Sequence, residues 1–226
     1  MDASATASGC ADALTAGQAG IVATNLTYLA FVDLLKKTET PRSTVAIVGS
    51  GARACAAIAA CQSLGFQVIC VTSRSWISTE ALHESESAQR LRRLGALPTL
   101  WPNVTDPVQS SNFSREMRMQ FREIAASANV FIQTVAVDSL STDARQISQT
   151  IPWSQTRRDA LVCDLVYGPS PGPFLASAEK EALARVGGIE MLTKYSARLV
   201  EFFTGQQLSR SLLHAAALRV CTRPFP

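Results

Sequence analysis

Small residues at a fixed spacing, Gly49-x-Gly51-x-x-Ala54, give the strongest chemical signal in the chain. They follow the apolar run 45–48 and open an alanine-rich stretch. In a strand-turn-helix unit this spacing permits a tight turn, the approach of a pyrophosphate to the backbone, and close helix–strand packing. Unpaired N–H groups at the start of the helix then favour phosphate groups. We therefore predict a dinucleotide-binding turn whose cofactor contacts include Gly49, Ser50, Gly51 and Ala52.

The end of the next predicted strand, 67–72, bears on the choice of nucleotide. An acid at this place binds the ribose hydroxyls of NAD, but here Thr72-Ser73-Arg74-Ser75 follows and no acid occurs until Glu80. An arginine pairs well with the 2′-phosphate of NADP. Ser73 and Arg74 therefore favour NADP as the cofactor, and an exposed arginine on a turn is the alternative that the sequence leaves open.

The elements that must position these residues alternate between helices and strands. Helices are expected at 25–37, 52–64, 87–94, 115–128, 174–185 and 189–203. Strands are expected at 45–48, 67–72, 97–101, 130–134 and 161–165, with 104–114 as a loop. This alternation predicts an α/β fold, a doubly wound parallel sheet of the Rossmann type with helices on both faces. Ligands of such sheets bind at the carboxyl ends of the strands.

Stretches in three parts of the chain together resemble the shikimate/quinate dehydrogenase family. The first is the glycine turn with Ser73-Arg74-Ser75, which is similar to the family's glycine-rich loop and its Asn-Arg-Thr/Ser clamp. The second runs from Asp164-Leu-Val-Tyr167-Gly-Pro169 to Pro173-Phe174-Leu175. The third runs from Gly188-Ile-Glu-Met191-Leu192 to Phe202-Phe203-Thr204-Gly205.

The resemblance implies a domain organisation and a set of site residues. It spans 21–205 as a nucleotide-binding domain, with 1–20 as a flexible lead-in, 206–226 as a tail, and most of the amino-terminal substrate domain absent. It implies that NADP binds with its nicotinamide near Tyr167, Gly188 and Met191. It also implies a cofactor contact at Thr134, after the fourth strand, and substrate-like positions at Asn25 and Tyr195.

The chain departs from the family at the acid/base pair. Hydride transfer at a ring carbon requires a proton to move at the carbinol oxygen, and a titratable group supplies or accepts it. The position of the family's aspartate is Thr27, and the family's lysine is absent because the first lysine is Lys36. Tyr195 stands for a substrate-binding glutamine, and Cys55 replaces a basic residue in the glycine turn. These departures predict that no catalytic residue of the family remains.

The principal interpretation is a degenerate, non-catalytic and regulatory domain. It resembles the dehydrogenase-like domain of the fungal quinate repressor, which controls quinate and shikimate metabolism. The alternative is a fragment of an NADP-dependent shikimate dehydrogenase, which reduces 3-dehydroshikimate to shikimate in aromatic amino acid biosynthesis. Both interpretations imply a small shikimate- or quinate-type ligand, and a protein partner or missing amino-terminal domains.

Composition restricts the partners and the compartment. The chain of 226 residues is 47% hydrophobic, and no apolar run approaches the roughly 20 residues of a membrane span. Its six cysteines show no disulfide or metal spacing, which predicts a reducing compartment, cytoplasm or nucleus, and no metal site. The net charge is only +3, and Arg90, Arg92 and Arg93 are expected on a solvated helix face, so nucleic acid is not an expected partner.

Overall fold

The computed structural model describes residues 1–17, 20–103, 112–168 and 170–221. Its centre is a parallel sheet of six strands in the order β5-β4-β3-β6-β7-β8. The strands are β3 (Thr44–Val48), β4 (Val68–Thr72), β5 (Leu97–Thr99), β6 (Val130–Gln133), β7 (Leu161–Asp164) and β8 (Ala184–Val186). The order reverses between β3 and β6, which places a topological switch point at their carboxyl ends. The predicted doubly wound Rossmann-type sheet is confirmed.

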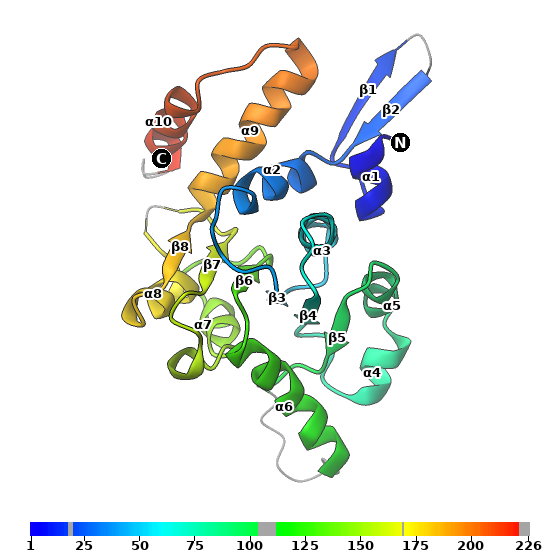
Figure 1. Ribbon diagram of the computed structural model, residues 1–226, viewed down its shortest axis with the longest axis vertical. Coiled ribbons are helices and arrows are strands. Elements are labelled where there is room, and N and C mark those ends of the chain that lie inside the picture. Colours follow the sequence, from blue (N-terminus) through cyan, green and yellow to red (C-terminus); the bar gives the residue numbers. More distant parts are fainter. Residues whose placement is uncertain (18–19, 104–111, 169, 222–226) are drawn as a thin grey trace.

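Helices cover both faces of this sheet (Figure 1). One face carries α2 (Leu26–Leu35), α3 (Ala52–Ser63), α5 (Glu86–Arg93) and α9 (Gly188–Thr204). The other face carries α6 (Asn112–Ala126), α7 (Thr142–Ser148) and α8 (Pro173–Lys180). Two short helices, α4 (Thr79–Glu84) and the 3₁₀ turn Trp153–Gln155, lie in the connections.

The buried strands explain why two layers of helices are needed. Every residue of β3 is buried; Val45 and Ile47 belong to the core on the α3 face, and Ala46 and Val48 belong to the core on the α6 face. Successive side chains of a strand point to opposite faces, so an apolar strand must be covered twice. Alanines and Cys55 on α3 let that helix approach the sheet closely, and all residues from Ala54 to Cys61 are buried.

Residues 1–17, which the sequence predicted as part of a flexible lead-in, contain regular secondary structure. They form α1 (Ala3–Ser8) and β1 (Ala13–Gly17), which pairs antiparallel with β2 (Gly20–Thr24) in a hairpin that projects from the body (Figure 1). Asp2 caps α1 through a 2.9 Å bond from the Ala5 N–H, and Ser4 and Ser8 are buried. Small polar residues give no periodic signal, because this segment is ordered by contacts with distant residues rather than by its own pattern.

The sheet also has a strand that the sequence did not predict. The helix expected at 174–185 ends at Lys180, and β8 follows it. The Ala182 N–H bonds to the Glu179 carbonyl oxygen and the Leu183 N–H to that of Ala178, while Ala182 takes a left-handed φ of 55°. Such a helix end usually carries glycine; with alanine in its place, the sequence gives no stop signal. The predicted loop 104–114 lies largely outside the described residues.

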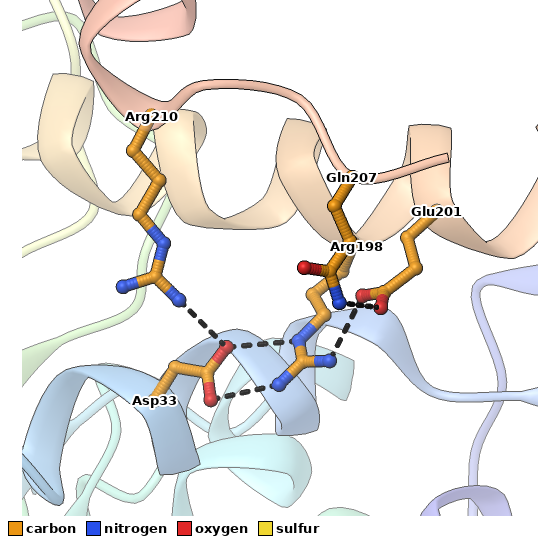
Figure 2. Close-up of polar contacts among 5 residues, drawn as sticks. All are labelled: Asp33, Arg198, Glu201, Gln207 and Arg210. Carbon is orange, nitrogen blue, oxygen red and sulfur yellow. Dashed lines mark hydrogen bonds and ion pairs between the residues drawn. The ribbon is translucent and has the colours of Figure 1, made fainter. Parts of the chain in front are cut away.

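Ion pairs fasten the last two helices to the body (Figure 2). Arg198 of α9 donates two 2.8 Å hydrogen bonds to the Asp33 carboxylate of α2, and a third to Glu201. Arg210, the first residue of α10 (Arg210–Cys221), lies 3.9 Å from Asp33. The predicted tail 206–226 therefore carries a helix that packs on α9. Hydrogen bonding to Asp33 raises the pKa of Arg198, which keeps the guanidinium charged.

We expect the Asp33–Arg198 pair to contribute measurably to stability. The two side chains are 18% and 32% exposed, so the pair lies between a solvated and a buried ion pair. Asp33→Asn and Arg198→Met should each lower the free energy of unfolding by about 1–2 kcal/mol. The double variant should lose less than the sum in urea denaturation. Arg158→Met is the control, because Arg158 is 78% exposed; full additivity of the two losses would contradict the expectation.

Candidate functional site

A groove opens at the switch point, between the carboxyl ends of β3 and β6. Its volume is about 510 Å³. The predicted cofactor residues Gly49, Ser50, Gly51, Ser73, Arg74 and Thr134 line it, together with Ser75 and Trp101. Crevices at this point of a doubly wound sheet are where such folds bind their ligands. The structure thus brings together residues that lie more than 80 positions apart in the sequence.

Gly49 permits the close approach of the two strand ends. Its φ is +119°, a conformation that residues with a side chain rarely adopt, and a Cβ at this position would collide with Thr134 Oγ1. Thr134 itself donates both its N–H and its hydroxyl to the Val48 carbonyl oxygen, at 2.9 and 3.0 Å. The missing side chain of Gly49 and the two bonds from Thr134 therefore hold the turn in place. The backbone of Gly49 stays accessible to a ligand in the groove.

The floor of the groove is a chain of hydroxyl groups. Ser50 Oγ donates to Ser73 Oγ at 3.0 Å, and Ser73 and Ser75 share a 3.2 Å hydrogen bond. Arg90 of α5 donates to the Ser50 carbonyl oxygen at 3.2 Å. Arg90 is exposed, as predicted for a solvated helix face, and its guanidinium also contacts the glycine turn. No local pattern indicates this contact, because it depends on how α5 packs.

Arg74, a predicted cofactor contact, lines the groove, but its side chain already has a partner. Its guanidinium forms an ion pair with Asp143 of α7, and both side chains are partly exposed. A phosphate that binds Arg74 must compete with this carboxylate. Asp143 was not recognised in the sequence, because no local pattern connects α7 with the end of β4.

A second hollow, of about 380 Å³, lies on the other side of the first turn of α3. Ser50 and Gly51 line the groove, whereas Ala52 and Arg53 line this pocket. Ala52, expected among the cofactor contacts, is thus placed in the pocket. The predicted residues Asn25, Tyr167, Gly188, Met191 and Tyr195 line it as well, together with Cys10, Asp12 and Thr27.

Gly188 sets the wall of the pocket. A Cβ at this position would collide with the backbone of Val166 and Tyr167, so only glycine lets the start of α9 approach the end of β7. Met191, one turn further, is buried in the core behind the pocket. The resemblance at Gly188 and Met191 therefore corresponds to a real contact between the second and third matching stretches.

Asn25 lines the pocket, but its side chain is already occupied. Its Oδ1 accepts the Tyr28 N–H at 2.8 Å and caps α2, while its amide group donates to Ser8 Oγ and to the Cys10 carbonyl oxygen. These bonds hold α1 against α2. The geometry gives Asn25 a positioning role in addition to the substrate-like position that the sequence predicted.

Asp12 supplies a carboxylate at the position where Thr27 lacks one. Its oxygens accept hydrogen bonds from the Thr27 hydroxyl at 2.5 Å and from the Leu26 and Thr27 N–H groups at 2.6 and 3.0 Å. Burial, and then the negative charge of Asp12, raise the pKa of Tyr195. Asp12 was missed because it precedes Thr27 by 15 positions and has no motif around it.

The described residues contain no group of three or more histidine, cysteine, aspartate or glutamate side chains that could hold a metal ion. Among them, no helix combines the length and the apolar content that a membrane span requires. The charged side chains at the two hollows are Asp12 and Arg53 in the pocket, and Arg74, its partner Asp143 and Arg90 at the groove.

No protein-family model matches the chain. The chain is 23% identical over 195 residues to the "Shikimate dehydrogenase (NADP(+))" of Crocosphaera subtropica, a match that covers 85% of this chain and 62% of that protein. The chain is thus similar in sequence to a shikimate dehydrogenase along most of its length. It spans less than two thirds of the length of this relative.

Solved structures of shikimate dehydrogenases have the same fold. The Thermus thermophilus shikimate 5-dehydrogenase in complex with NADP(H) and shikimate superposes with a TM-score of 0.68 and 18% identity, over 96% of this chain and 71% of that one. The 5-ketofructose reductase of a Gluconobacter strain superposes with a TM-score of 0.71 and 14% identity, over 97% and 72%. The shikimate dehydrogenase-like fold therefore occurs with more than one substrate, and the substrate must be argued from the site.

The signature acid Asp164 lies outside both hollows, in a small cavity that Gln133 also lines. Asp164 is 3% exposed, and its Oδ1 accepts the Val166 N–H at 3.0 Å. Burial raises the pKa of Asp164 from its ordinary value to about 6. In the described part of the chain, the buried Oε1 of Gln133 has no hydrogen-bond partner. Burial in this cavity therefore disfavours the charged form of the carboxyl.

We expect Asp164 to make stability depend on pH. Because the folded protein binds this proton up to about pH 6 and the unfolded chain releases it near pH 4, the free energy of unfolding falls as pH rises through this window. Asp164→Asn should remove that loss. Relative to the unsubstituted protein, the variant should gain about 2–3 kcal/mol in urea denaturation between pH 4 and pH 7.

The control for this pH dependence is Asp159→Asn. Asp159 is exposed, and hydrogen bonding to Arg157 lowers its pKa, so any change should be small and of opposite sign. The difference in the free energy of unfolding between Asp164→Asn and the unsubstituted protein should change between pH 4 and pH 7. The same difference at both pH values would contradict a raised pKa of Asp164.

Proposed function

We propose that the chain is a shikimate dehydrogenase-like oxidoreductase that binds NADP(H) in the groove and a hydroxylated carboxylic acid of the shikimate type in the pocket. One observation carries the proposal: the groove at the switch point and the pocket meet at the first turn of α3, and the predicted site residues line one or the other. A nucleotide that follows the groove thus ends beside the pocket.

The residues of the groove fit a dinucleotide phosphate. Gly49 leaves the backbone bare where a Cβ would collide with Thr134, and Gly51 has open space around its Cα. The amino-terminal N–H groups of α3, a helix of 12 residues, favour an anion. Ser50, Ser73 and Ser75 offer hydroxyl groups, and Arg74 offers a cation at the rim. Bound NADP would supply or accept a hydride.

Asp143 makes the nucleotide preference testable. We expect Arg74→Ala to weaken NADP binding about tenfold, through loss of a charge-assisted bond to the 2′-phosphate, and to leave NAD binding nearly unchanged. Asp143→Ala should strengthen NADP binding by roughly twofold to fivefold, because it frees a partly exposed ion pair. Calorimetric titration with each nucleotide measures both effects.

The matched control for the nucleotide titration is Arg145→Ala. Arg145 lies on the same helix and, among the described residues, its guanidinium bonds only to the nearby Leu140 and Thr142. The variant should bind both nucleotides as the unsubstituted protein does. Absence of heat with NADP and with NAD would refute nucleotide binding, and an equal loss for the two nucleotides in Arg74→Ala would refute a 2′-phosphate contact.

A second candidate is a regulatory protein that binds the same ligands without turnover. It is favoured by Thr27 at the position of the family's acid and by the lack of lysine among the described residues that line the pocket. The resemblance to a fungal quinate repressor belongs to this candidate and stays a prediction. NADP-dependent oxidation of shikimate or quinate by the purified chain, followed through NADPH absorbance, would reject it; tight binding of both ligands without turnover would support it.

A further inference from the structure

Asp12 is the only acidic side chain among the described residues that line the pocket. It directly precedes β1, and its backbone N–H bonds to the Thr24 carbonyl oxygen at 3.1 Å. This bond fixes the Asp12 backbone beside the last residue of β2. The hairpin of β1 and β2 thereby brings a residue from far upstream next to the start of α2.

The carboxylate of Asp12 is held firmly but has acceptor capacity left. A carboxylate offers about four lone-pair sites. The Leu26 N–H, the Thr27 N–H and the Thr27 hydroxyl take three of them. One site is free, and Asp12 is exposed to the pocket. A hydroxyl group of a ligand is the donor that this site would take.

We propose that Asp12 is the hydroxyl-binding carboxylate of the pocket and replaces the acid that position 27 lacks. The inference rests on the proposed function, because it assumes that the pocket takes a hydroxylated acid. Thr27 then has a positioning role, since its hydroxyl and N–H orient the Asp12 carboxylate. The carboxylate of the pocket then belongs to Asp12, next to β1, and not to residue 27 at the start of α2.

Arg53 completes the chemistry of the ligand. It lies in the first turn of α3, lines the same pocket, and forms no hydrogen bond or ion pair with any other described residue. A pocket with one carboxylate and one free guanidinium suits a ligand that has hydroxyl groups at one end and a carboxylate at the other. Repulsion from Asp12 would direct the carboxylate of the ligand toward Arg53.

The test is calorimetric titration of the full chain with shikimate in the absence of nucleotide, so that no turnover adds heat. Asp12→Asn should weaken shikimate binding about tenfold, because a bond to a charged acceptor becomes a bond to a neutral one. The double variant Asp12→Asn with Thr27→Asp returns a carboxylate to the same place from the α2 side. It should recover the original affinity to within about threefold.

A matched control and a second ligand sharpen the result. Asp138→Asn changes an exposed aspartate outside the pocket and should bind shikimate as before. The methyl ester of shikimate should bind the unsubstituted protein more weakly than the acid does, and Arg53→Met should remove the difference. Thermal unfolding of each variant shows whether it is folded, and the double variant serves as the test if Asp12→Asn is not.

Three outcomes would overturn the inference. They are an unchanged affinity in Asp12→Asn, a loss that the double variant does not restore, and no shikimate binding by the unsubstituted protein. The NADP titration tests the proposed function separately. If NADP binds and the affinity for shikimate is the same with and without the Asp12 substitution, the proposed nucleotide site is supported and the proposed role of Asp12 is refuted.

Discussion

The contact between the turn after β3 and the end of β6 is the constraint on which the site depends. Gly49 has no side chain and a positive φ, so Thr134 can bond twice to the Val48 carbonyl oxygen. These bonds hold the ends of β3 and β6 together where the strand order reverses. The groove lies beyond these two ends, where Gly49 has no side chain that could occupy it. A larger residue at Gly49 would push β6 away or turn the chain into the groove. The rest of the sheet is built outward from this pair, with β4 carrying Ser73 and Arg74 to one side and β7 carrying the wall of the pocket to the other.

The pocket depends on a second, longer-range constraint, which is the position of α9 against α2. Gly188 brings the start of α9 onto the end of β7, and Arg198 fixes the middle of the helix on Asp33. Between these two points lie Met191 and Tyr195, which face the pocket. The side chains opposite them, Asp12 and Thr27, come from the hairpin and from α2. A stable contact between α2 and α9 is thus a condition for the pocket as well as for the fold.

The sequence predicts the fold and the nucleotide groove better than it predicts the pocket. Apolar strands, the alanine-rich helix and the glycine turn are local patterns, and each was found at its place. The end of α8 was missed because Ala182 adopts a conformation that usually marks glycine. The order of residues 1–17 was missed because Ser4 and Ser8 also bond to Asn25, which lies far along the chain. Asp12, Arg90 and Asp143 act through contacts across the fold. No spacing along the chain reveals such contacts, so these residues could be recognised only in three dimensions.

Thr27 lacks the carboxylate of the family's acid, whereas Asp12 brings a carboxylate into contact with Thr27. A missing motif residue shows that one position no longer carries a charge; it does not show that the site has lost the charge. In the pocket, the carboxylate comes from Asp12. It accepts hydrogen bonds from the Leu26 N–H and from the N–H and the hydroxyl of Thr27, so it lies against Thr27. In the glycine turn, Cys55 stands where a basic residue was expected, while Arg90 reaches the same turn from α5. Thr27 alone therefore does not show that the pocket has lost its carboxylate.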